Sequence, residues 1–140
     1  MADNKFSIYA GPPIQAALAH LQDGASRSGR LNTIAERYLE IVKRSTPALA
    51  LGEWYALVDN LNGTLLAEVL TVRGIALNVA DEPELADKWG IDHAALVRRL
   101  SGMAFPELVA IAEVVERFWN GDYTAPEREA LAKAGAKISP

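Results

Sequence analysis

Six residues near the N-terminus, Lys-Phe-Ser-Ile-Tyr-Ala at positions 5–10, give the clearest strand signal in this 140-residue chain. Apolar and polar side chains alternate, as in a strand with one buried face. A single strand cannot stand alone, because its N–H and C=O groups need partners. No other segment gives an equally clear strand signal, so we expect pairing with the same strand of a second copy. The inward face would carry Phe6 and Ile8, and the outward face Lys5, Ser7 and Tyr9.

Two helices are predicted after this strand. Pro12 and Pro13 suit a first helical turn, and a short apolar face follows from Ile14 to Leu21. Gly24 is a natural helix stop, and Ser26 is a good N-cap for a second helix running to about residue 44. The apolar stripe of this second helix comprises Leu31, Ile34, Ala35, Tyr38, Ile41 and Val42.

The rest of the chain reads as helical. Amphipathic segments are predicted at 51–61, 64–77, 81–89, 93–100 and 106–119, with a last helix capped by Thr124. We therefore expect a mainly α protein with two parts: a strand–helix–helix unit at 1–46 and an all-α region at 47–140 for oligomerisation or partner binding. Three tryptophans are expected as core or interface anchors: Trp54, Trp89 and Trp119.

Composition argues against an enzyme, a metal site or a cofactor. Cysteine is absent, and neither His20 nor His93 has the spacing of a zinc ligand. His93 is expected at the surface, after the cap residue Asp92. No nucleotide-binding or nucleophile motif occurs. An acidic cluster is interpreted as a solvated face: Asp81, Glu82, Glu84 and Asp87. With no signal peptide and no long apolar run, we expect a cytoplasmic protein without a membrane partner.

Charge is distributed unevenly. Residues 1–45 hold six basic and four acidic residues, a net charge of +2, whereas residues 46–140 hold eight basic and fourteen acidic residues, a net charge of −6. Contact with nucleic acid is therefore expected in the first third of the chain.

The order strand, short helix, glycine turn and longer helix resembles the ribbon–helix–helix family, which includes the Arc and methionine repressors. The resemblance covers about residues 5–44, and residues 24–39 are similar to that family's turn and second helix. It implies a dimer in which two antiparallel strands form a ribbon over four helices. The first helix is about two residues shorter than usual. The outward strand positions also lack the arginine or amide that the family often has there.

The resemblance also implies roles for individual residues. Proteins of this family recognise double-stranded DNA with β-strands that lie in the major groove. The outward strand residues Lys5, Ser7 and Tyr9 would therefore read bases. The start of the second helix would clamp a phosphate through Ser26, Arg27, Ser28 and Arg30. The dimer core would contain Phe6, Ile8, Leu31, Ile34 and Tyr38.

Each role has a plainer alternative. Ser26 would serve only as an N-cap, Arg27 and Arg30 only as solvated charges, and Lys5 and Ser7 as the solvent side of an edge strand.

Three functions compete. The first is a homodimeric, DNA-binding transcriptional repressor. The second is an antitoxin that neutralises a partner, although residues 48–120 are more apolar and periodic than a tail that folds on binding. The third is a protein-interaction module or inhibitor, in which the ribbon is only a dimer seam.

Overall fold

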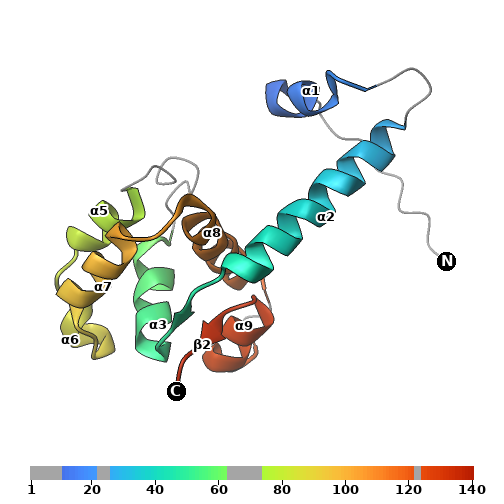
Figure 1. Cartoon of the computed structure of the whole chain (residues 1–140). Coiled ribbons are helices and arrows are strands. Elements are labelled where there is room, and N and C mark those ends of the chain that lie inside the picture. Colours follow the sequence, from blue (N-terminus) through green and yellow to red (C-terminus); the bar gives the residue numbers. More distant parts are fainter. Residues whose placement is uncertain (1–10, 22–25, 63–73, 122–123) are drawn as a thin grey trace. The chain divides into compact units, whose positions relative to one another are not determined.

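The structure, a computed structural model, describes residues 11–21, 26–62, 74–121 and 124–140. Within these ranges it contains eight helices and two short strands (Figure 1). The mainly α prediction is therefore confirmed. The predicted ribbon strand at 5–10 lies outside the described residues.

The chain divides into two compact units, Met1–Leu39 and Glu40–Pro140. The boundary between the two units falls within helix α2 (Arg27–Ser45), whose last six residues belong to the second unit. The boundary expected from the sequence lay at residues 46 and 47, close to the proline that follows this helix.

The first unit contains α1 (Pro12–Leu18) and the beginning of α2. Gly11 is extended and precedes two prolines, whose fixed φ suits the first turn of α1. The helix ends at Leu18, earlier than its apolar pattern suggested. Gly24, the predicted stop, lies outside the described residues.

The second unit is organised around α3 (Leu51–Asn60), which packs against α5 (Gly74–Ala80), α6 (Leu85–Trp89) and α8 (Phe105–Trp119). Helix α7 (His93–Ser101) covers α5, and α9 (Glu127–Lys133) lies against α8. Fully buried side chains form one core, among them Leu49, Trp54, Leu57, Ile75, Leu85, Leu96, Leu100, Leu108, Ile111 and Leu131.

Two strands in the second unit correct the expectation of an all-α region. Strand β1 (Ala48–Leu49) pairs in parallel with β2 (Lys137–Ile138). The indole Nε1 of Trp54 donates to the Lys137 carbonyl at 3.0 Å, which ties the end of the chain to α3. Strands of two residues are too short to show an alternating pattern, so no local signal predicts them.

The tryptophan prediction is confirmed. Trp54 is fully buried, and Trp89 and Trp119 are half-buried with their indole N–H groups bonded to Asp59 and to the Val58 carbonyl. Because of these bonds, the large rings pack against the core and each indole N–H still has a hydrogen-bond acceptor.

Two polar residues lie deeper than expected. His93 is half-buried, and its Nε2 lies 2.7 Å from the Val79 carbonyl. Glu82 is only partly exposed, because its carboxylate accepts a 2.9 Å hydrogen bond from the buried amide of Asn60. The other three members of the acidic cluster are exposed, as predicted: Asp81, Glu84 and Asp87. Asn60 also exchanges hydrogen bonds with Asn78, which joins α3 to α5.

Candidate nucleic-acid interface

The beginning of α2 is built around Ser26. Its hydroxyl oxygen accepts a 3.0 Å hydrogen bond from the Gly29 N–H, and its carbonyl accepts from the Arg30 N–H. This is the N-cap predicted from the sequence. The Arg27 and Ser28 N–H groups belong to the first turn, where a helix offers no internal acceptor.

The predicted phosphate-binding residues are brought together at this helix end. Ser26, Arg27 and Ser28 are exposed, and Arg30 is half-exposed one turn further along. Neither arginine forms an ion pair with a described residue. The helix dipole, N–H groups without an acceptor among the described residues, and two guanidinium groups all favour an anion here. The site therefore has the chemistry to hold a phosphate.

The predicted base-reading residues cannot be placed beside this site. Lys5, Ser7 and Tyr9 lie outside the described residues, as do the predicted dimer-core residues Phe6 and Ile8. Their roles remain expectations from the resemblance.

The apolar side chains of the first unit lack a closed core. Leu31 and Ile34 are half-buried and Tyr38 is 39% exposed. On α1, Ile14 and Leu18 are also half-buried, and no described residue of this unit is classed as buried. Two short helices cannot bury their own apolar faces. Further apolar surface must cover them.

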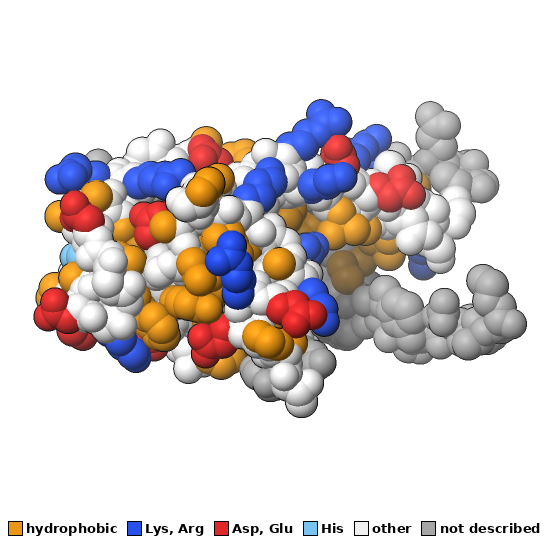
Figure 2. All heavy atoms as spheres, turned by 90° about the horizontal axis from the view of Figure 1, so that it is seen from below, with side chains coloured by type: hydrophobic (Ala, Val, Ile, Leu, Met, Phe, Trp, Pro, Cys, Tyr) orange, Lys and Arg blue, Asp and Glu red, His pale blue; other side chains and the backbone are white. Residues whose placement is uncertain are grey.

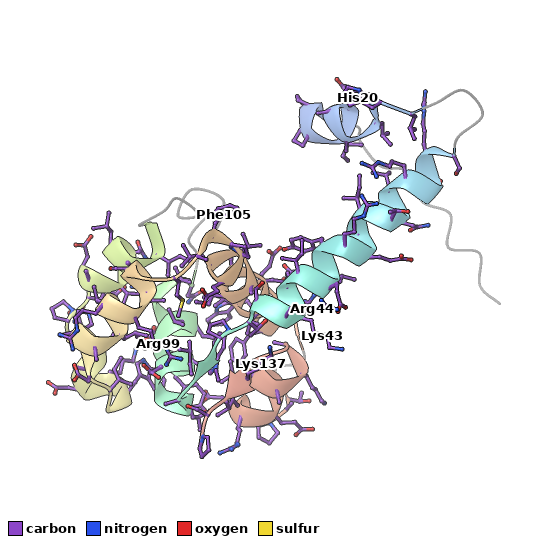
Figure 3. The ribbon with its side chains drawn as sticks, in the orientation of Figure 1. His20, Lys43, Arg44, Arg99, Phe105 and Lys137 are labelled. Atoms are coloured by element: carbon purple, nitrogen blue, oxygen red, sulfur yellow. The ribbon has the colours of Figure 1, made fainter. Side chains whose placement is uncertain are left out.

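Four basic residues form a second feature, in the Glu40–Pro140 unit. We call Lys43, Arg44, Arg99 and Lys137 the basic strip (Figure 3). The Lys137 ammonium donates to the Lys43 carbonyl at 2.7 Å, at the last turn of α2. Arg99, on α7, donates through Nη2 to the Ala48 carbonyl at 2.6 Å. Because Ala48 pairs with Lys137 between the strands, these contacts bring Arg99 and Lys137 close to the end of α2, where Arg44 follows Lys43 in the sequence.

Acidic neighbours neutralise the basic strip only in part. Arg44 pairs with Glu40 at 2.8 Å, with 78% and 53% of the two side chains exposed. Arg99 lies 3.8 Å from Glu53, whose carboxylate also accepts a 2.9 Å hydrogen bond from the Ala50 N–H. The Arg44–Glu40 pair is weak, because water screens both exposed charges, and the Arg99–Glu53 pair is long at 3.8 Å.

Sequence analysis missed the basic strip as a group. Lys43 and Arg44 were counted with the first third of the chain, whereas Arg99 and Lys137 lay in a region of net negative charge. The strip arises from the pairing of β1 with β2, which no local spacing reveals.

Other kinds of site find no support in the part of the chain that is described. No three histidine or acidic side chains there are placed to hold a metal ion. Likewise, no helix within those ranges has both the length and the apolar character to cross a membrane. No protein-family model, curated protein or solved structure matches the chain.

Proposed function

We propose that this chain is a homodimeric, non-enzymatic DNA-binding protein that acts as a transcriptional repressor. The observation that carries the proposal is the Ser26-capped start of α2, where Arg27, Ser28 and Arg30 lie within the first turns of the helix. The resemblance to the ribbon–helix–helix family supports the same role, with Lys5, Ser7 and Tyr9 as the base-reading residues.

Dimerisation follows from the open apolar faces of the first unit. The half-buried Leu31 and Ile34 and the exposed part of Tyr38 would pack against the same helices of a second copy. Burying apolar area contributes roughly 25 cal/mol per Å², so closing these faces supplies the stability that a unit of this size lacks. In the dimer, the strand at 5–10 would gain its antiparallel partner.

DNA binding is a local property in this proposal, because the chain as a whole has a net charge of −4. Each dimer presents two copies of the α2 start. Phosphate contacts there set the position of the protein on the duplex, and the ribbon supplies sequence preference. Two-fold symmetry implies an inverted repeat as the preferred site.

The first experiment is selection of bound duplexes from a random pool by the full chain at low salt. We expect enrichment of an inverted repeat. Ser7→Ala should reduce affinity for the enriched site by about 1–3 kcal/mol and leave binding to unrelated duplexes nearly unchanged. Arg27→Ala should weaken both about equally, because a phosphate contact carries no sequence information.

The variant Ser26→Asp distinguishes the role of Ser26 as a helix cap from its proposed role in binding a phosphate. Aspartate is as good an N-cap as serine, and its charge complements the helix dipole, so the melting temperature should not fall. The same charge would repel a phosphate, and losing a charged hydrogen bond costs about 1.5–3 kcal/mol, which corresponds to tenfold or more in affinity. A variant that melts normally and binds DNA as well as wild type would show that Ser26 is only a cap.

Absence of any duplex binding at low salt by an intact dimer would refute the repressor. The protein-interaction module would then be favoured, because the apolar faces of α1 and α2 would serve a protein contact alone.

A further inference from the structure

We propose that the basic strip is a second surface for the phosphate backbone of duplex DNA, separate from the start of α2. This goes beyond the proposed function, because it places a nucleic-acid contact in the unit whose net charge is negative.

The first argument is charge segregation. Residues 40–140 hold ten basic and fifteen acidic residues, a net charge of −5. Four of those ten basic residues come together in the strip, next to two acidic partners, Glu40 and Glu53. In the view of Figure 2, Lys and Arg side chains recur along the upper edge, with Asp and Glu side chains interspersed. A cationic group on an otherwise anionic body gives a local field that selects one side of the protein for a polyanion.

The second argument is that the strip is assembled from three separate elements. Lys43 and Arg44 end α2, Arg99 belongs to α7, and Lys137 begins β2 (Figure 3). Basic residues in a last helical turn stabilise the helix dipole, which is sufficient reason for the first two. Arg99 also lies in the last turn of its helix, so the same reason covers it, but it gives no reason for Lys137, which begins β2.

The third argument is that the structural contacts leave donors free for a ligand. Lys137 uses one bond to reach the Lys43 carbonyl, and an ammonium has three donors. Arg99 directs Nη2 to the Ala48 carbonyl, and a guanidinium has five. These bonds fix the two cations in place while 47% of the Arg99 side chain stays exposed. Cations held in position lose less entropy when they bind a phosphate.

Duplex DNA is the polyanion that suits this arrangement. A row of cations without an enclosed cavity matches the regular charge of a phosphate backbone better than one small anion. The cations of the strip are proposed to contact phosphates, which carry no sequence information, so the contribution of the strip should not depend on sequence.

The test uses the full chain with Lys43→Gln and Arg44→Gln combined. Both side chains are exposed, so the tryptophan-fluorescence melt of the second unit should be unchanged. Affinity for a long random-sequence duplex is measured over a range of salt concentrations. Each lost phosphate contact should reduce the slope of log K against log salt by about 0.9, or about 1.8 per chain for the pair. Affinity at low salt should fall tenfold or more.

The matched control is Lys133→Gln. Lys133 forms an exposed i,i+4 pair with Glu129 at 3.4 Å, as Arg44 does with Glu40, but it belongs to α9 and not to the last turn of α2, which Lys137 contacts. It also removes one positive charge, so it corrects for net charge. The control should change the slope much less than Arg44→Gln alone.

The outcomes separate this inference from the proposed function. If Ser26→Asp weakens binding and the strip variants do not, the repressor proposal stands and the strip is only structural. If the strip variants weaken binding and Ser26→Asp does not, the strip is the phosphate site and the α2 start is not. Wild-type protein that binds no duplex overturns both.

Discussion

Replacing Gly52 with alanine should destabilise the second unit, although alanine is the better helix former. Gly52 lies in the first turn of α3, and helix propensity alone would favour alanine by about 1 kcal/mol. A Cβ at this position, however, would lie 2.6 Å from the Trp89 carbonyl oxygen and 3.0 Å from Cγ2 of Ile91. The oxygen belongs to the backbone at the end of α6, so no side-chain rotation relieves the clash.

The expected cost follows from these distances. Forcing one extra carbon into a packed contact costs about 1–3 kcal/mol, and here α3 and α6 must move apart. After the propensity gain, we expect a net loss of up to about 2 kcal/mol. For a unit of this size, each kcal/mol lowers the melting temperature by roughly 4–8 °C.

Tryptophan fluorescence is a suitable probe, because Trp54, Trp89 and Trp119 all belong to the second unit. The control is Gly29→Ala in α2, where a Cβ would meet only Ser26 atoms at 3.5 and 3.6 Å, an ordinary contact. That variant should gain about 0.5–1 kcal/mol in the first unit, seen by circular dichroism. Gly52→Ala melting at or above the wild-type temperature would refute the close approach of α3 to α6.

Three further predictions concern the dimer, the helix cap and pH. Ile34→Asp should abolish the dimer in sedimentation at micromolar concentration, because an unpaired charge would be buried at a cost of several kcal/mol; a folded wild-type monomer would contradict the dimer itself. Ser26→Ala should cost about 1 kcal/mol of helix stability, measured by urea unfolding, through loss of the cap bond; an unchanged midpoint would count against the cap. Burial alone would raise the pKa of Asp59, but hydrogen bonds from Lys88 and Trp89 and the Lys88 charge outweigh it and hold that pKa below its ordinary value. The stability from this carboxylate is present above its unfolded pKa and lost as pH falls through the folded one, so Asp59→Asn should be less stable than wild type at pH 7, and the difference should shrink below about pH 4 in acid-titration melts.

Features that depend on neighbouring residues were predictable from the sequence. Ser26 caps α2 as expected, and the carboxylate of Asp92 accepts from the Ala95 N–H at 3.0 Å to begin α7. A cap needs only a short side chain and the next three residues, so its signal is contained in one segment. The last helix shows the limit: it begins at Glu127 after Pro126, rather than at the predicted cap, Thr124.

Features that depend on distant residues were not predictable. His93 was expected at the surface because it follows a cap, but α5 brings the Val79 carbonyl to its ring. The basic strip required Lys137 to meet the end of α2, and that contact follows from strand pairing across the whole second unit. Local propensity carries no information about such long-range contacts, because tertiary packing determines them.

The pairing of β1 with β2 also affects how the protein is made. The indole of Trp54 finds its acceptor 83 residues later in the chain, at the Lys137 carbonyl. At roughly 5–20 residues per second, a ribosome needs about 4–17 s to synthesise that stretch. During this interval Trp54 has been made, but its acceptor and the strand that pairs with β1 have not. Folding of the second unit therefore cannot be completed before the segment that contains Lys137 has been synthesised.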